Sequence, residues 1–428
     1  MKIVYGLFFL IIFNLPLFAY IDPGTGSMLF SLIMGVSATL YFFARSMLIK
    51  MKGMALGKNT AASLRGESPK PEKFVFYNEG VQYWNVFKPV LDAFERRGIA
   101  VLYLTSTEQD PFFKEAYQHS TGKYIGTGNK AYAALNVLEA DVCLMTTPAL
   151  EVYQLKRSKG VKHYAHILHD TGDTTCYRLF GLDWFDSILL TGEYQKQDIR
   201  ELENIRATRH KELVVTGSTY LDVYREKIQH LQSEENHPFT VLISPSWGQG
   251  ALLSAFGKKL LDPLSETGWR IIIRPHPQSK KSEAGMLQNL AEQYKATPNF
   301  EWDYAPENLP SLSKSDVMIS DFSGIIFDYV FLFDKPVLYT NAFFNIEMYD
   351  ACDLDHKPWR FEVVKTFGRE LRESDLNRLP CLVKKAAEDE GSSLARQHAK
   401  ETAWQHIGES GERVADFLLE VRERITSC

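Results

Sequence analysis

The segment around Arg274 and His276 combines side chains that bind anions. Both residues follow the apolar run at 271–273, and Pro275 and Pro277 flank the histidine. Proline fixes the backbone and lacks an N–H group, so the run ends sharply and the loop is stiff. A guanidinium presents a fork of donors that suits phosphate, and an imidazole can donate or accept. The alternative is an arginine that pairs with a carboxylate and a histidine that caps a turn; the combination favours ligand binding.

A second candidate anion site lies where a buried strand is expected to run into a helix. The residues at this junction are Ser320, Asp321, Ser323 and Gly324, with Asp328 one turn further on. An ordinary helix N-cap would use the same residue types. Free backbone N–H groups and the helix dipole at such a junction also bind anions, and the two serines add hydroxyl donors. Because Asp321 would repel a phosphate placed on it, we expect it to hold a sugar hydroxyl, orient a neighbour or fix the loop.

His169 is a candidate general base in a loop that follows a third apolar run. Imidazole titrates near neutral pH, and Asp170 or Asp173 could orient the ring. A single histidine in a loop is more often structural. The assignment of His169 as a base therefore depends on whether the two candidate anion sites lie opposite it. A fourth loop contains Ser244 and Trp247. Its small residues allow close approach of a ligand, while the tryptophan either stacks on a base or wedges the domains apart.

These segments belong to a chain in which short apolar runs alternate with helical patterns. Strands are predicted at 74–77, 100–104, 141–146, 163–168, 187–191 and 212–216, and again, after a polar stretch, at 240–244, 270–273, 317–320 and 336–339. Such runs separated by helices are typical of parallel sheets covered on both faces. We therefore predict an α/β fold of two doubly wound parallel-sheet domains that face a cleft. Such sheets bind ligands at the carboxyl ends of their strands, where the candidate residues lie.

Residues 1–52 are predicted to anchor the chain in a membrane. The runs at 3–19 and 28–49 are apolar, and the second reaches the roughly 20 residues that a transmembrane helix needs. The first is either a signal-like segment cleaved near Ala19 or one arm of a hairpin. Lys50 follows the second run, so the positive-inside rule predicts an inner-membrane protein with its domains on the cytoplasmic side. The alternatives are a buried core hairpin or, if only the first segment is removed, a secreted enzyme.

The remainder of the chain is divided into four parts by composition. Residues 53–73 are predicted to form a linker, 74–235 and 236–391 two Rossmann-like domains, and 392–428 a helix that packs back across both. The length of 428 residues agrees with two globular domains, because a single core rarely grows beyond about 300 residues.

Composition argues against several other classes. With 45% hydrophobic and 24% charged residues, the chain is expected to fold. A net charge of −5 without a basic cluster gives no reason to expect nucleic acid as a partner. Five scattered cysteines suit neither a disulfide framework nor a zinc site. The triplet Asp353-Leu354-Asp355 is better explained as a solvated loop than as a metal ligand set, so no metal and no cofactor are expected.

Taken in order, the motifs resemble those of the CDP-glycerol glycerophosphotransferases, the teichoic-acid primases and polymerases. Residues 320–329, followed by Lys335-Pro336-Val337, are similar to the S-D-Y-S-S, F-D and P-V pattern of that family, and 274–277 to its R-x-H-P. Residues 244–247 are similar to its P-T-W, 169–171 to its H-G-T, and Thr216-Gly217 with Asp222 to its T-G-x-x-x-x-D. The resemblance covers roughly 74–340 in the right order, which is more specific than any single motif.

The resemblance implies a GT-B arrangement with the acceptor in the first domain and the donor mainly in the second. It implies that the donor diphosphate is held by Arg274, His276, Ser320 and Ser323, and that His169 is the base. The chain departs from the family pattern at three places. Asp170 replaces the glycine after the histidine, Gly324 replaces the second serine, and Asp173 lies near the place of a usual basic residue.

The leading hypothesis is transfer of glycerol phosphate from CDP-glycerol to a hydroxyl of a cell-envelope glycan or lipid-linked acceptor, with release of CMP. The expected catalytic residues are His169, His276 and Arg274. The expected donor-binding residues are Ser244, Trp247, Arg274, His276, Ser320, Asp321, Ser323, Gly324 and Asp328. Two alternatives keep the fold: a GT-B glycosyltransferase that uses a nucleotide sugar, and a non-catalytic binding protein of envelope assembly.

Overall fold

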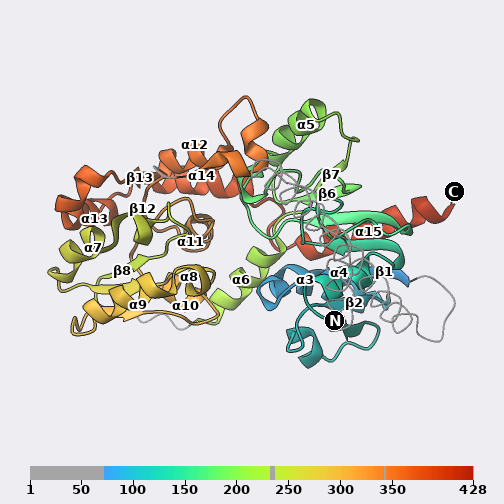
Figure 1. Ribbon diagram of the computed structural model, residues 1–428, viewed down its shortest axis with the longest axis horizontal. Helices are drawn as coiled ribbons and strands as arrows, with labels where there is room; N and C mark the ends of the chain where they lie inside the picture. The colour runs from blue at the N-terminus through green and yellow to red at the C-terminus, as the bar shows by residue number, and fades with distance from the viewer. Residues whose placement is uncertain (1–71, 232–236, 342–343, 428) are drawn as a thin grey trace, which may run out of the picture. The chain divides into compact units, whose positions relative to one another are not determined.

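The computed structural model describes residues 72–231, 237–341 and 344–427, which contain two parallel β-sheets (Figure 1). The first sheet has the strand order β3-β2-β1-β4-β5-β6-β7, and the second has the order β10-β9-β8-β11-β12-β13. The strands of the first are β1 (Glu72–Asn78), β2 (Leu102–Thr105), β3 (Thr121–Tyr124), β4 (Glu139–Met145), β5 (Gly160–Ile167), β6 (Ser187–Leu190) and β7 (Glu212–Val215). Those of the second are β8 (Thr240–Ile243), β9 (Arg270–Ile273), β10 (Phe300–Trp302), β11 (Val317–Ser320), β12 (Val337–Tyr339) and β13 (Gly368–Glu370).

Helices connect the strands of both sheets. Those of the first sheet are α3 (Trp84–Arg96), α4 (Asn129–Leu135), α5 (Gln195–Ile205) and α6 (Thr219–Gln229). Those of the second are α7 (Leu252–Ser265), α8 (Ser279–Ser282), α9 (Ala284–Gln293), α10 (Leu309–Lys314), α11 (Ile325–Phe333) and α12 (Trp359–Phe367). After β13 follow α13 (Leu379–Ala387), α14 (Ser393–Ala403) and α15 (Ser410–Ser427). Short 3-10 turns are η1 (Val81–Tyr83), η2 (Pro111–Lys114), η3 (Thr174–Cys176), η4 (Ile346–Met348), η5 (Asp350–Asp353) and η6 (Glu373–Arg378).

The strands send alternate side chains into two different apolar layers, as the pleat of a strand requires. Phe74 and Phe76 of β1 pack in one core cluster together with α3 and α15. Val75 and Tyr77 of the same strand pack in the opposite cluster with α4. The strands of the second sheet divide in the same way between the first cluster and a third one. Both faces of each sheet are therefore covered, which explains why the strands appear as unbroken apolar runs.

Every predicted strand overlaps an observed strand, but the sequence did not indicate β3, β10 and β13. All three lie at sheet edges and have three or four residues, with sequences such as TGKY and GRE. An edge strand has a neighbour on one side only and tolerates polar side chains, so its apolar signal is weak. The predicted C-terminal helix is two helices, α14 and α15, with a break from Trp404 onward.

The membrane part of the predicted fold class was wrong for what the structure describes. Within 72–231, 237–341 and 344–427, no helix is both long and apolar enough to cross a bilayer. The predicted spans at 3–19 and 28–49 lie outside the described residues. For the described residues the fold class is corrected to two parallel-sheet α/β domains, and the predicted domain boundaries stay predictions.

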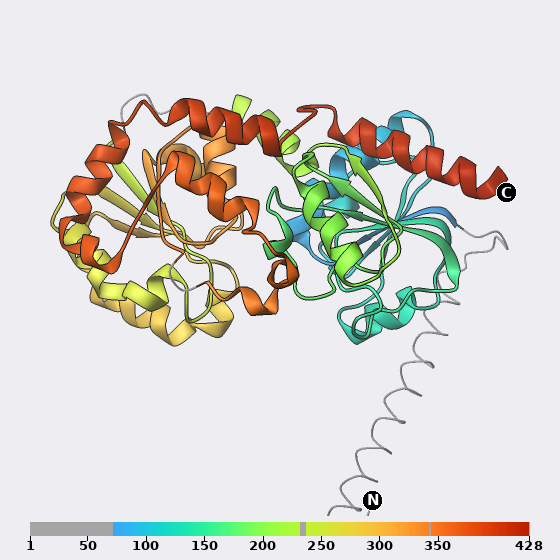
Figure 2. The ribbon, with the colours of Figure 1, turned by 90° about the horizontal axis from the view of Figure 1, so that it is seen from above.

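Asp222 anchors the turn between α14 and α15 to α6. Its Oδ1 accepts hydrogen bonds from Nε1 of Trp404 at 3.0 Å and from the N–H of Gly408 at 2.8 Å. Its Oδ2 accepts from the N–H and the hydroxyl of Ser410. From this turn α14 runs back along α11 and α12, while α15 packs on α3 and β4 (Figure 2). One carboxylate therefore determines where the C-terminal helices change from one sheet to the other.

The variant Asp222→Ala should lower the free energy of unfolding by about 3 kcal/mol, because it leaves several buried donors without an acceptor. Urea titration followed by circular dichroism measures this change. Glu420→Ala is the matched control, since Glu420 is exposed on α15. Equal stability of the two variants would contradict the anchoring role of Asp222.

Candidate functional site

The loop after β5 and the loop before α11 are in contact. A Cβ atom built on Gly324 would lie 2.5 Å from Oδ2 of Asp170. A second connection comes from Tyr220 on α6, whose hydroxyl donates to Oδ1 of Asp328 on α11 at 2.7 Å. Both loops lie at the carboxyl ends of parallel strands, where such sheets bind ligands. The structure thus brings the loop of His169 together with one of the predicted donor loops.

His169 is held by Thr146 and not by either predicted aspartate. Its Nδ1 lies 3.1 Å from Oγ1 of Thr146, which follows β4, and the ring of Tyr83 packs edge-on against it at 4.9 Å between centroids. Burial lowers the pKa of His169, and the charge of Asp170 partly opposes this shift. The ring is therefore neutral at physiological pH. If Nδ1 carries the proton and donates to Thr146, Nε2 is left as an acceptor for a substrate proton.

The carboxylates of Asp170 and Asp173 accept hydrogen bonds from groups other than His169. Oδ1 of Asp170 accepts from the N–H of Gly172 at 2.6 Å. Oδ1 of Asp173 accepts from the N–H and the hydroxyl of Thr175, and its Oδ2 accepts from the N–H of Arg360. Thr146, which the sequence analysis missed, is the partner of His169. Its position directly after β4 was the available signal.

His276 and Trp247 lie side by side at the carboxyl ends of β9 and β8. Their ring centroids are 6.4 Å apart, and Trp247 is 38% exposed. Nδ1 of His276 accepts from the N–H of Gln278 at 3.1 Å. Burial lowers the pKa of His276, with Glu283 opposing the shift, so the ring is neutral and carries its proton on Nε2. His276 therefore caps a turn with one nitrogen and presents a donor with the other.

Arg274 directs its guanidinium to the loop after β10. It forms an ion pair with Asp303 and donates to the backbone oxygen of Ala305 at 2.7 Å. This is the carboxylate-paired alternative that the sequence left open. The pair fixes the loop after β10 beside β9, and the backbone oxygen of the half-exposed Tyr304 in this loop accepts from Lys280 of α8 at 3.0 Å. A direct phosphate contact by Arg274 would require exchange of the Asp303 pair.

Asp321 organises the donor loops from a fully buried position. Its Oδ1 accepts from the N–H of Ser246 at 2.8 Å and from that of Ser323 at 3.1 Å, and its Oδ2 accepts from the N–H of Leu252 at 2.8 Å. Burial raises the pKa of Asp321 to about 6, while these hydrogen bonds oppose the shift. Of the three roles considered for Asp321, the geometry supports fixing the loop.

The two predicted serines at the end of β11 differ in what they offer a ligand. The hydroxyl of Ser320 is buried and donates to the backbone oxygen of Ser244 at 2.6 Å, so it joins β11 to β8. Ser323 is half-buried, and only its backbone N–H is engaged by Asp321. Asp328, also predicted to bind the donor, accepts from Tyr220, and burial raises its pKa to about 7. The donor-binding roles of these residues stay predictions.

Arg360 is a buried cation that the sequence analysis did not identify. Nη1 of its guanidinium donates to Oγ1 of Thr175 at 3.0 Å, and within the described residues Nη2 has no hydrogen-bond partner. Burial opposes the charge, but Cys176, Asp170 and other neighbours raise the pKa of Arg360. It lies at the start of α12, far in sequence from the β5 loop that it contacts, so no local pattern could have indicated it.

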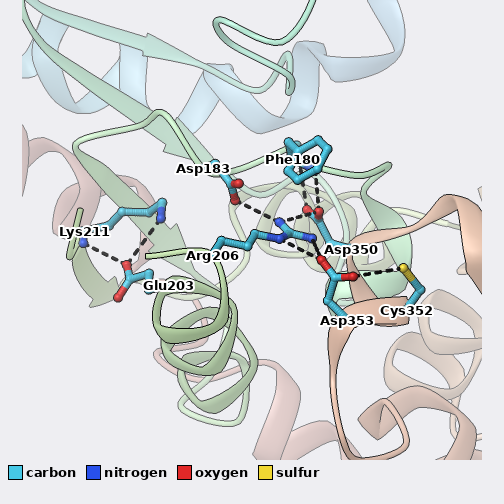
Figure 3. A network of polar contacts seen from close by, with 9 residues as sticks. Phe180, Asp183, Glu203, Arg206, Lys211, Asp350, Cys352 and Asp353 are labelled. Carbon is cyan, nitrogen blue, oxygen red and sulfur yellow. Dashed lines mark hydrogen bonds and ion pairs between the residues drawn. The ribbon is translucent and has the colours of Figure 1, made fainter. Parts of the chain in front are cut away.

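A further contact between the two sheets' parts is built around Arg206, as Figure 3 shows. Its guanidinium pairs with Asp183 at 2.9 Å, Asp350 at 2.8 Å and Asp353 at 2.7 Å. Asp350 also accepts from the N–H of Phe180 at 2.6 Å. The segment after β12 is thereby joined to the loop before β6. Asp353, part of the D-x-D triplet, serves this ion pair.

Two parallel sheets whose carboxyl-end loops meet in this way define a GT-B-like α/β protein. Solved structures of similar fold include a variant of the wall teichoic acid polymerase TagF soaked with CDPG. That structure is 14% identical with a TM-score of 0.54, over 92% of this chain and 99% of that one. A UDP-GlcNAc 2-epimerase from Methanocaldococcus jannaschii in complex with UDP-GlcNAc and UDP is 13% identical with a TM-score of 0.53, over 81% and 99% of the two chains. At these identities the likeness concerns fold alone.

The sequence itself gives the closer assignment. Residues 206–362 match the model of the CDP-Glycerol:Poly(glycerophosphate) glycerophosphotransferase family. The resemblance noted from the motifs is thereby confirmed. The match contains the loops of Trp247, His276 and Asp321, whereas His169 lies before it. No curated protein sequence matches the chain significantly.

The variant Asp321→Ala should destabilise the protein by about 3 kcal/mol, because three N–H groups would lose a buried acceptor. Differential scanning calorimetry measures the shift in melting temperature. Asp389→Ala, at an exposed carboxylate of the same half of the chain, is the control. A melting temperature equal to that of the control would show that Asp321 does not fix the loops.

Proposed function

We propose that the chain transfers glycerol phosphate from CDP-glycerol to a hydroxyl of a cell-envelope glycan or lipid-linked acceptor. The supporting observation is that the family match includes His276 and the loop before α11, and that this loop touches the loop of His169 through Asp170 and Gly324. The neutral imidazole of His169 therefore belongs to the first-sheet loop of this contact. The loop before α11, which lies within the family match, forms the other side.

The proposed reaction forms one bond to phosphorus and breaks another. The acceptor oxygen attacks the glycerol-bearing phosphorus of CDP-glycerol, the bond between that phosphorus and the bridging oxygen breaks, and CMP leaves with that oxygen. Nε2 of His169 takes the proton of the acceptor hydroxyl. Nε2–H of His276 and the N-terminal end of α11 stabilise charge on the phosphates, which is the main catalytic task in phosphoryl transfer.

Arg274 enters this proposal as a positioning residue as well as a predicted phosphate ligand. Its pair with Asp303 holds the loop after β10 beside the His276 loop. Trp247 is exposed next to His276 and offers a face on which a nucleobase can stack. Together these residues form one wall of the proposed donor site on the second sheet.

Release of the nucleotide tests the proposed reaction. The purified protein is incubated with CDP-glycerol and with a panel of nucleotide sugars, each with candidate acceptors, and the released nucleotides are separated by chromatography. We expect CMP from CDP-glycerol alone. Release of a nucleoside diphosphate from a nucleotide sugar would instead support a glycosyltransferase, and absence of release from every donor would support a binding protein.

The variant His276→Ala should lower kcat for CMP release by about 10²–10³, because it removes one donor to the developing charge. His398→Ala is the matched control, since His398 is exposed on α14. Melting temperatures of both variants report on folding. Wild-type turnover by a folded His276→Ala variant would contradict the role of His276.

The loss of activity at acid pH should have its midpoint below 6.5, the ordinary pKa of histidine. Burial lowers the pKa of His169 from 6.5, and the base acts only when unprotonated. Activity is therefore retained as pH falls towards 6.5 and is lost only at lower pH. A profile of kcat/KM from pH 4.5 to 9, measured as CMP release, checks this sign. An acid limb at or above pH 6.5, or one that persists in His169→Ala, would refute the assignment.

A further inference from the structure

Part of the connection between β12 and β13 lies on the loop that follows β5. In this connection α12 begins at Trp359, and the backbone N–H of Arg360 donates to Oδ2 of Asp173 at 2.7 Å. Nη1 of Arg360 donates to Oγ1 of Thr175 at 3.0 Å. A segment between two strands of the second sheet therefore holds a loop of the first sheet, the one that carries His169, at two points.

Trp359 connects the same loop to α11. Its ring centroid lies 4.3 Å from that of Tyr194 and 5.5 Å from that of Phe327, which belongs to α11. The hydroxyl of Tyr194 donates in turn to the backbone oxygens of Thr171 and Gly172. Three packed aromatic rings therefore run from α11, which begins at a predicted donor loop, to the backbone of the loop after β5.

Arg360 also balances the charge of that loop. Its side chain is buried, and its guanidinium carbon lies 5.6 Å from the centroid of the Phe327 ring. Burial opposes the charge, whereas Cys176, Asp170 and Asp173 raise the pKa of this guanidinium. A buried cation at this position offsets carboxylates that would otherwise lose water without gaining a counter-charge.

We infer that Trp359 and Arg360 form a clamp that sets the position of the His169 imidazole relative to the donor loop before α11. The described partners of the His169 ring are Thr146, Tyr83 and Tyr177. The clamp therefore acts on the base through the loop that carries it, and its two members are positioning residues. The inference rests on the proposed function, in which the base must stand in line with the attacking hydroxyl.

The donor loops do not depend on this clamp. The loop of Trp247 is held by Asp321 through the N–H of Ser246, and His276 caps its own turn through Gln278. Loosening the clamp should thus misplace the base and leave the donor-binding loops in position. The expected kinetic effect is a lower kcat with little change in KM for CDP-glycerol.

Arg360→Met tests this split, because it keeps much of the side chain's volume and removes its charge and donors. We expect kcat for CMP release to fall by about 10²-fold, the loss that follows a displacement of about 1 Å in a reacting group. Arg360→Lys restores the charge and should recover part of kcat. A normal kcat in a folded Arg360→Met variant, or a rise in KM alone, would overturn the clamp.

Arg396→Met is the matched control. Arg396 is a buried arginine of α14 that pairs with Asp334 at 2.6 Å, and within the described residues its Nη1 has no hydrogen-bond partner. Both substitutions should lower the melting temperature, but only Arg360→Met should lower kcat in assays well below it. Trp359→Leu leaves every charge in place and should show the same split, which covers an Arg360→Met variant that does not fold. Equal losses of kcat at positions 360 and 396 would overturn the positioning role.

The reactivity of Cys176 reports on the clamp without reference to activity. Its Sγ lies 3.4 Å from Nη1 of Arg360, whereas Cys143 is fully buried in β4. In a protein whose other cysteines are replaced by serine, we expect Arg360→Met to raise the rate of Cys176 labelling by a thiol reagent several-fold, because the loop opens more often. Arg396→Met should leave this rate unchanged.

The labelling rate separates the two proposals. An unchanged rate in Arg360→Met would overturn the clamp and leave the proposed function standing in a wild type that releases CMP. A wild type that releases no CMP would overturn the proposed function, and the labelling rate would then decide whether Arg360 holds the loop after β5.

Discussion

The burial of one carboxylate shapes the second-sheet half of the site. Asp321 is shielded from water, so its charge can be met only by groups of the protein. The N–H groups that meet it come from Ser246, Leu252 and Ser323, which belong to three separate segments. The loop of Trp247, the start of α7 and the loop before α11 must therefore adopt one common geometry. The positions of His276 and Gly324 relative to these loops follow from it.

The two sheets are joined by contacts that are hard to separate. Arg206, which follows α5, is buried among three carboxylates, two of which lie in the segment after β12. Arg360 of α12 is buried against the loop after β5. Pulling the sheets apart would break the pairs of Arg206 with Asp350 and Asp353 and the hydrogen bond of Arg360 to Thr175. Adjustment to a ligand is therefore expected in exposed loops, such as that of Trp247, more than in a swing of whole domains.

The sequence predicted the sheets well because both faces of each are covered, and buried strands leave long apolar runs. It failed at β3, β10 and β13, where short edge strands leave none. For the site, the ends of the predicted strands located the right loops. The types of the residues in these loops did not determine their hydrogen-bond and ion-pair partners. Arg274 and His276 had two explanations each, and the choice depended on Asp303 and Gln278, which no motif contains. Arg360 could not be found, since its contact with the β5 loop exists only in three dimensions.

The position of α15 has a consequence for the order in which the protein can be made. Val414 and Leu418 of α15 belong to the same apolar cluster as Phe74 and Phe76 of β1. Glu412 adds ion pairs to Arg96 and Arg97 at the end of α3. During translation, the first sheet therefore emerges from the ribosome long before the helix that covers it. The part of its apolar face that α15 covers stays open until nearly the whole chain is synthesised, a period in which newly made domains are prone to aggregate and depend on chaperones.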